Sequence, residues 1–292
     1  MTGLPPARRA CLAVPGSAPD KLAKAAGRGA DELVIDLEDG VAVAAKATAR
    51  AAVAAALADL DLSGVGVSVR VNAPRTPWCH EDVAAVAAAA PLRSIVLPKV
   101  ESAGDLAFVD RLLDGVEAAA GRREPVRVQA LIETAAGVHR LHEIAGASAR
   151  LESLILGYAD LATSLGRLEA AATDLARWDA TRDAVLVAAR THGLQAIDGP
   201  FLGLQPDAAF VAAATRARDA GFDGKWAIHP AQIAPLVELF TPAPHEVEHA
   251  RAVLAALDSA DQGAIAVDDQ MLDEAHRRAA MSTLARAGEP VA

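Results

Sequence analysis

Charged side chains stand at the ends of several short apolar segments of the chain. Glu133 lies in the run VQALIETAAG and Asp160 in LESLILGYADLATSLG, each just after a β-branched and leucine-rich stretch. Arg70 lies at the end of a third stretch, VGVSVRVN, and the pair Glu38-Asp39 follows a fourth, ELVIDL. A (β/α)8 barrel builds its site from polar groups at the carboxyl ends of successive strands. Two carboxylates and a guanidinium at one such edge suggest a divalent cation beside an anionic substrate.

Glu133 and Asp160 are the candidate metal ligands. They follow the fifth and sixth apolar segments, which would be neighbouring strands about 4.8 Å apart. Two carboxylates that close can share Mg2+, with Mn2+ as a possible substitute, whereas no His or Cys accompanies them to suit zinc. The alternative is helix capping, by Glu133 for a helix beginning near Thr134 and by Asp160 for one after Tyr158. Their matching places at two strand ends favour the metal.

Arg70 is the candidate anchor for a substrate carboxylate, because guanidinium grips that group with two hydrogen bonds. The alternative is a salt bridge to Glu38 or Asp39, and the two roles can alternate. Glu38 and Asp39 could bind metal directly, hold its water molecules or orient Arg70, and we favour contacts through water. Lys99, in VLPKVES, adds a cation to the same edge unless it is an exposed loop lysine.

Composition excludes several other classes of protein. The formal net charge of −10 argues against nucleic acid or an anionic membrane as partner. Cys11 and Cys79 are the only cysteines, too few for a disulfide framework, and we expect a buried or inert thiol at each. No apolar run reaches about 18 residues and the first residues lack the apolar core of a signal peptide. We therefore expect a soluble cytoplasmic protein.

Eight short apolar segments alternate with helical patterns, which predicts a (β/α)8 barrel over residues 1–240, with an open doubly wound sheet as the alternative. The expected strands are 10–14, 32–37, 66–71, 94–97, 127–132, 153–156, 195–197 and 225–228. The expected helices are 20–27, 42–59, 81–89, 104–120, 136–145, 174–192, 207–220 and 231–239.

Residues 241–292 form a C-terminal helical extension without a strand for the barrel. The segment TPAPHE at 241–246 breaks the alternation and opens a helix. A loop or short hairpin is expected over 262–270 and a final helix over 271–287. We expect the extension to pack on a barrel rim or on a neighbouring subunit.

Lys21 and Lys24 follow a predicted helix start near Asp20. Backbone N–H groups at a helix start together with lysines suit a phosphate. The alternative is an ordinary solvated helix face.

Together these motifs resemble the citrate lyase beta-subunit-like proteins of the HpcH/HpaI aldolase/citrate lyase superfamily, which include malyl-CoA and citramalyl-CoA lyases. The matching segments are RRACLAVPGSAPDKLAKA, ADELVIDLEDGV, VRVNAPRTPW, VLPKVES, QALIETAAG, LILGYADLATSLG, GLQAIDGP, AGFDGKWAIHPAQI and FTPAPHEVEHA. They occur in order along nearly the whole chain.

The resemblance implies a TIM barrel with Mg2+ on Glu133 and Asp160, and a substrate carboxylate on Arg70 with Glu133 also in contact. It implies CoA near Lys21 and Lys24, and homotrimers that sometimes pair into hexamers. The tail AVDDQMLDEAHRRAA resembles the family segment whose aspartate reaches a neighbouring subunit's site as acid or base, and here that residue is Asp273.

The implied activity is a Mg2+-dependent carbon–carbon lyase that cleaves or forms a β-hydroxyacyl-CoA thioester such as malyl-, citramalyl- or citryl-CoA. The same site could support malate synthase or thioesterase activity. Two alternatives are a class II pyruvate-type aldolase acting on free hydroxy-keto acids and a non-catalytic subunit of a lyase complex. The sequence leaves the acyl group open.

Overall fold

The structure is a computed structural model that describes residues 7–167, 175–259, 264–267 and 270–289. The contacts divide the chain into two compact units, one comprising Arg8–Val237 and the other comprising Glu238 onward together with Ala7. No described helix is both long and apolar enough to cross a membrane.

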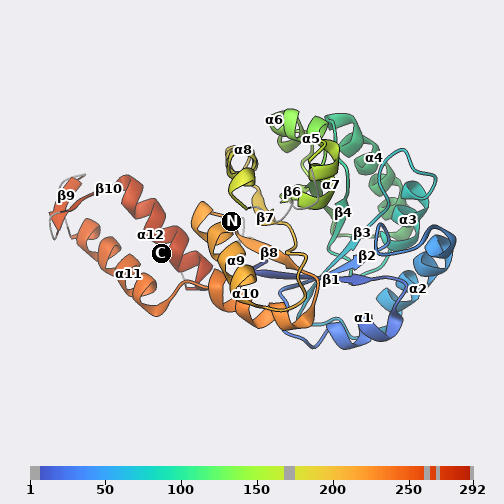
Figure 1. The fold of residues 1–292 in the computed structure, drawn as a ribbon, viewed down its shortest axis with the longest axis horizontal. Helices are drawn as coiled ribbons and strands as arrows, with labels where there is room; N and C mark the ends of the chain where they lie inside the picture. The colour runs from blue at the N-terminus through green and yellow to red at the C-terminus, as the bar shows by residue number, and fades with distance from the viewer. Residues whose placement is uncertain (1–6, 168–174, 260–263, 268–269, 290–292) are drawn as a thin grey trace. The chain divides into compact units, whose positions relative to one another are not determined.

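The first unit is a closed barrel of eight parallel strands with helices around it, as predicted (Figure 1). Each strand pairs with its sequence neighbours, and β1 also pairs with β8, which closes the sheet. The strands are β1 (Ala10–Pro15), β2 (Glu32–Asp36), β3 (Gly66–Arg70), β4 (Ser94–Leu97), β5 (Arg127–Ile132), β6 (Leu151–Leu156), β7 (Gln195–Asp198) and β8 (Gly224–Ala227).

The helices around the barrel follow the predicted segments with differences of three kinds. The expected helix 136–145 is two short helices separated at Arg140, the expected helices 42–59, 174–192 and 231–239 contain a 3-10 turn before the α-helix, and α7 forms between β6 and β7. The helices are α1 (Pro19–Ala25), α2 (Lys46–Asp59), α3 (Cys79–Val86), α4 (Ala103–Ala120), α5 (Ala135–His139), α6 (Leu141–Ala145), α7 (Tyr158–Ser164), α8 (Asp179–Thr191), α9 (Ala208–Ala220) and α10 (Ile233–Phe240). The 3-10 turns are η1 (Val43–Ala45), η3 (Leu175–Trp178) and η4 (Pro230–Gln232).

Inward-facing side chains fill the barrel in layers, because residues alternate between the two faces of each strand. The middle layer is an apolar cluster of Cys11, Val34, Val96, Leu131, Ile155, Ile197 and Trp226. Two residues further along β2 and β5, the same alternation brings Asp36 and Glu133 to the carboxyl-end rim. The apolar layer therefore forms the floor beneath the charged rim.

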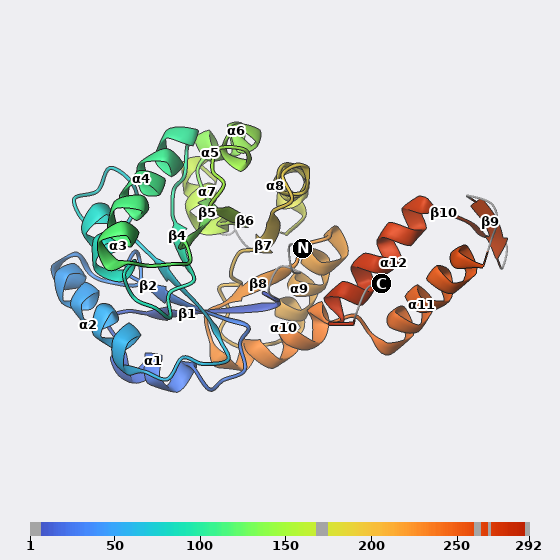
Figure 2. The same cartoon turned by 180° about the vertical axis from the view of Figure 1, so that it is seen from behind.

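The second unit is a helical hairpin with a small sheet, drawn in orange and red in Figure 2. Helices α11 (Pro244–Asp258) and α12 (Glu274–Arg286) pack side by side, and β9 (Ala264–Val267) pairs antiparallel with β10 (Gln270–Asp273). The expected final helix 271–287 thus begins at Glu274, because the preceding residues form β10. Part of the expected loop or hairpin, residues 262–263 and 268–269, lies outside the described residues.

Candidate active site

Arg70, at the end of β3, is held in a fixed orientation by Asp36 at the end of β2. The strand register places the two residues side by side. Arg70 Nε donates to Asp36 Oδ1 and Nη2 donates to Oδ2, each at 2.7 Å. The Asp36 carboxylate also accepts the backbone N–H groups of Glu38 and Gly40, both at 2.8 Å. One carboxylate therefore joins Arg70 to the loop that carries Glu38.

Sequence reasoning missed Asp36. The signal was present, since Glu32, Val34 and Asp36 share one face of β2 and an acidic residue beside an inward arginine is a natural partner. Burial raises the pKa of Asp36, but the hydrogen bonds and charge of Arg70 outweigh it, so the pKa lies below its ordinary value.

The expected ion pair between Arg70 and Glu38 is present. Arg70 Nη1 lies 3.0 Å from Glu38 Oε2, and the guanidinium carbon lies 5.7 Å from the centre of the Trp226 ring. Asp39 does not pair with Arg70 and instead lies 3.4 Å from Lys99 Nζ. Because Asp36 occupies the Nε and Nη2 edge, the Nη1 end of Arg70 is the part directed toward Glu38.

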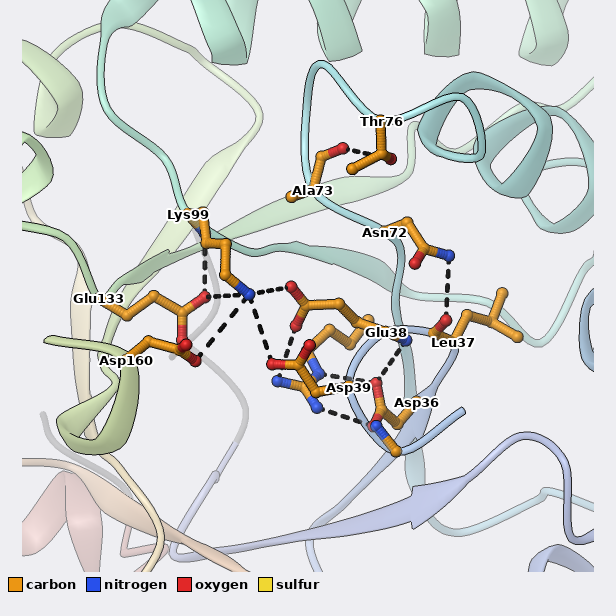
Figure 3. A network of polar contacts seen from close by, with 12 residues as sticks. Asp36, Leu37, Glu38, Asp39, Asn72, Ala73, Thr76, Lys99, Glu133 and Asp160 are labelled. Carbon is orange, nitrogen blue, oxygen red and sulfur yellow. Dashed lines mark hydrogen bonds and ion pairs between the residues drawn. The ribbon is translucent and has the colours of Figure 1, made fainter. Parts of the chain in front are cut away.

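Lys99 brings the remaining carboxylates of the rim together, as Figure 3 shows. Its ammonium donates a short hydrogen bond to Glu38 Oε1 and lies 4.0 Å from Glu133 Oε1 and 3.9 Å from Asp160 Oδ2. Burial lowers the pKa of Lys99, but the surrounding carboxylates, Glu38 first, raise it above its ordinary value. Lys99 is therefore a charged member of this cluster and not an exposed loop lysine.

The backbone of Lys99 also fixes Glu133. Lys99 has a φ of 53°, in the left-handed region, and its N–H donates to Glu133 Oε1 at 3.0 Å. A β-carbon at Gly157 would lie 2.7 Å from Glu133 Oε2, so only glycine leaves room for this carboxylate. Glu133 is 2% exposed.

A buried lysine supports the loop after β2. Lys46 donates from Nζ to the backbone oxygens of Leu37 at 2.9 Å and of Glu38 at 2.7 Å, and is 6% exposed. Sequence reasoning gave it no role, because its backbone partners leave no trace in the residue pattern.

Electrostatics at the rim favour a cation. Burial, followed by the charge of Glu38, raises the pKa of Glu133 well above its ordinary value, against the opposing effects of Lys99 and Arg70. Burial likewise raises the pKa of Glu38. Five carboxylates and two basic groups make up this network. They are Asp36, Glu38, Asp39, Glu133, Asp160, Arg70 and Lys99.

Glu133 and Asp160 fit a magnesium ion by their unused oxygens. Neither caps a helix: Thr134 caps α5, and α7 begins after Gly157 with Asp160 in its first turn. No described residue donates a hydrogen bond to Glu133 Oε2 or to the Asp160 carboxylate. Among the described residues no three His, Cys, Asp or Glu side chains gather as metal ligands. Two carboxylates suffice for Mg2+, which keeps several water molecules and takes substrate oxygens.

The other predicted site residues make none of the ion pairs of this rim cluster. Lys21 and Lys24 are exposed on α1, the helix that follows β1. Asp273 caps α12, where its Oδ1 accepts the N–H groups of Ala275 at 2.9 Å and of His276 at 3.3 Å.

Comparison with known proteins identifies the family. The pattern of the HpcH/HpaI aldolase/citrate lyase family matches residues 9–230. The chain is 37% identical over 291 residues to an L-malyl-CoA/beta-methylmalyl-CoA lyase of Cereibacter sphaeroides, covering 92% of each chain. It is also 36% identical to a (3S)-malyl-CoA thioesterase of the same species, over 96% of this chain and 94% of the relative.

Solved structures similar to this chain point to the same family. The CitE protein of Mycobacterium tuberculosis, in complex with magnesium, acetoacetate and coenzyme A, shares 35% identity with a TM-score of 0.77, over 97% of this chain and 99% of that one. A citrate lyase from Burkholderia xenovorans shares 26% identity with a TM-score of 0.87, over 99% and 94% of the two chains. The chain therefore belongs to the HpcH/HpaI aldolase/citrate lyase family.

Proposed function

We propose that this protein is a Mg2+-dependent carbon–carbon lyase acting on a β-hydroxyacyl-CoA thioester of the malyl-CoA or β-methylmalyl-CoA type. The observation that carries the proposal is the pair of carboxylates, Glu133 and Asp160, whose oxygens lie 4.0 and 3.9 Å from the same atom, Lys99 Nζ, in the network that also holds Arg70. The relationship to malyl-CoA lyases over nearly the whole chain supports this choice of substrate class.

Each residue has a defined task in this proposal. Glu133 and Asp160 would hold the cation, and Mn2+ would replace Mg2+. The bound cation would stabilise negative charge on the substrate oxygen as the carbon–carbon bond breaks. Arg70, oriented by Asp36, would bind the terminal carboxylate of the acyl group through its Nη1 end. Glu38 and Asp39 would hold water molecules and keep Arg70 and Lys99 in place.

The cleavage releases one proton and takes up one. The hydroxyl group gives up its proton to solvent water as it becomes a carbonyl, the carbon–carbon bond electrons pass to the thioester enolate, and a proton is added to the enolate carbon. We assign that last transfer to Asp273 of a neighbouring subunit. Lys21 and Lys24 would contact the phosphates of CoA.

The test is turnover of the purified chain on malyl-, β-methylmalyl-, citramalyl- and citryl-CoA. Cleavage should need Mg2+ or Mn2+ and should stop in EDTA. Glu133→Gln and Asp160→Asn should each abolish turnover and weaken Mn2+ binding measured by electron paramagnetic resonance, with an unchanged circular dichroism spectrum. Full activity of both variants in EDTA would exclude the proposed metal site.

Thioester hydrolysis is the second candidate reaction, because this chain is also 36% identical to a (3S)-malyl-CoA thioesterase over 96% of its length. Product analysis separates the two reactions, since cleavage gives a keto acid and a shorter acyl-CoA, while hydrolysis gives a free hydroxy acid and CoA. Turnover of free hydroxy-keto acids alone would instead indicate a pyruvate-type aldolase. No turnover on any substrate would indicate a non-catalytic subunit.

The assignment of Asp273 requires an oligomer, and we propose a homotrimer, alone or paired into a hexamer. Asp273→Asn should leave Mn2+ binding and molar mass by light scattering unchanged but remove cleavage. Mixing it with an Arg70→Ala variant under subunit exchange should restore part of the activity. If Asp273 only caps α12, the Asn variant will keep its rate.

A further inference from the structure

A buried group of four polar side chains lies outside the barrel wall. Tyr158 begins α7, Arg182 lies on α8, and Asp198 and Lys225 come from β7 and β8. Asp198 and Lys225 alternate with the inward residues Ile197 and Trp226 and therefore point away from the barrel interior. None of the four exceeds 6% exposure.

The Tyr158 hydroxyl is the link between the acidic and basic members of this group. It donates a short hydrogen bond to Asp198 Oδ1 and accepts one from Arg182 Nε at 2.8 Å. Lys225 Nζ donates to Asp198 Oδ2 at 2.5 Å and to the Gly199 backbone oxygen at 2.6 Å. Burial, followed by the charge of Asp198, raises the pKa of Tyr158, which keeps the hydroxyl protonated as a donor. The Tyr158 hydroxyl, both Asp198 oxygens and the Lys225 ammonium thus have hydrogen-bond partners, and buried hydrogen bonds of this kind restrict the movement of the groups that they join.

Asp160, two residues further along α7, has no comparable support. Within the described part of the chain no hydrogen bond reaches its carboxylate, and its one ion pair there is with Lys99 Nζ at 3.9 Å. The position of the Asp160 carboxylate therefore depends on the backbone of α7. That helix has seven residues and no side-chain cap at its start. A helix this short is marginal alone and depends on its tertiary contacts.

The contacts of α7 differ at its two ends. Near the middle, Leu161 and Ala162 are buried, and at the end Ser164 Oγ accepts the Ala135 N–H at 2.9 Å. At the start, where Asp160 lies, the hydroxyl of Tyr158 supplies the polar anchor. Apolar packing resists separation of the helix from the barrel, whereas the directional hydrogen bonds fix the rotation of its first turn.

We infer that Tyr158 is a positioning residue for the metal ligand Asp160, acting through the Asp198–Arg182 network on the outer side of the barrel wall. The inference rests on the proposed metal site. Removing the Tyr158 hydroxyl would leave the ring in place but free the first turn of α7. The two carboxylates would then spend less time at the separation that one cation requires.

The test is Tyr158→Phe, with Mn2+ binding measured without substrate by electron paramagnetic resonance and stability measured by urea unfolding. The control is Arg190→Gln. Arg190, also on α8, holds Asp223 at 2.9 and 3.0 Å near the other ends of β7 and β8. Both variants should lose stability. Only Tyr158→Phe should weaken Mn2+ binding, by about tenfold, as removal of residues that orient metal ligands does.

The outcomes are distinguishable. Wild-type affinity in Tyr158→Phe, alongside measurable binding to the wild type, overturns the role of Tyr158 and leaves the metal site standing. An equal loss of affinity in Arg190→Gln also overturns it, because the effect would then follow stability alone. If the wild type binds no Mn2+, the metal site and the inference both fail.

Discussion

Arg70 offers a substrate only part of its guanidinium, because Asp36 already takes two of its N–H groups at 2.7 Å. The sequence led us to expect a two-point grip on a substrate carboxylate, with Glu38 or Asp39 as an alternating partner. In the structure only the Nη1 end of the Arg70 guanidinium, near Glu38, is left for a substrate. A substrate carboxylate would have to displace Glu38 from its ion pair with Arg70 or share Nη1 with it. A fixed guanidinium loses little freedom on binding, which favours affinity.

Arg70→Lys tests the anchor. A lysine cannot keep the two bonds to Asp36 and also reach the substrate, so we expect a loss of about 2–4 kcal/mol in transition-state binding, roughly 30- to 1000-fold in kcat/KM. Steady-state kinetics on the preferred acyl-CoA measures this. A change below about threefold would make Arg70 a structural ion-pair partner only.

Asp36→Asn tests the support of Arg70 through pH. The pKa of Asp36 is lowered in the folded protein, so as pH falls below about 4 the unfolded chain takes up the proton first and stability is lost. At pH 7 the Asn variant should be about 2 kcal/mol less stable than wild type. That difference should shrink as pH falls from 5 to 3. Urea unfolding across this range measures it, and a constant difference would contradict the prediction.

At the residue scale, the sequence predicts side chains that follow strands and misses those that depend on backbone geometry. Glu133 and Asp160 could be proposed as metal ligands from the sequence because apolar segments end just before them. Asp36 lies inside its segment and was read as part of the strand. Lys99 was recognised only as a nearby cation, since its left-handed φ of 53° has no signature in the residue type.

At the element scale, the junction between β6 and α7 places both proposed metal ligands. Gly157 ends the strand segment and lies against Glu133, and the helix that carries Asp160 begins at the next residue. One short connection therefore sets the separation of the two carboxylates.

Gly157→Ala should disturb this junction. The added β-carbon would lie 2.7 Å from Glu133 Cβ and Oε2, closer than packed atoms approach, so Glu133 must move. We expect Mn2+ affinity to fall at least about tenfold. Gly115→Ala is the matched control, because its β-carbon meets nothing within 4 Å in the middle of α4. It should keep Mn2+ affinity and gain up to about 1 kcal/mol.

Elements were predictable where a repeated pattern extends over several residues. All eight strands lie where apolar segments stand between helical ones, with ends shifted by up to two residues for β6. The break at Arg140 was not predicted, and a helix after Tyr158 entered only as an alternative role for Asp160, because five- and seven-residue helices hold too few turns to show a periodicity.

At the scale of the whole molecule, the two thiols report on the integrity of the barrel. Cys11 is 1% and Cys79 2% exposed. Burial raises the pKa of Cys79 to about 12 and that of Cys11 well above its ordinary value. Both should resist Ellman's reagent at pH 8 and react fully in guanidinium, with a native rate limited by unfolding. Rapid reaction of either thiol in the native protein would contradict this.

The partners of Arg8, which lies just before β1, bear on how the chain folds during its synthesis. Its guanidinium is 2% exposed and bonds to Glu32, Glu152 and Gln195, the last of them 187 residues away. One edge of β1 pairs with β8, so the backbone groups of that edge stay unpaired until β8 has been synthesised. During synthesis the first strand therefore leaves the ribosome long before its last partners exist. Every unfinished chain therefore has an unpaired sheet edge and an Arg8 that lacks some of its partners. Unpaired edges favour aggregation, so we expect the unfinished chain to aggregate more readily than the folded protein and to depend more on chaperones.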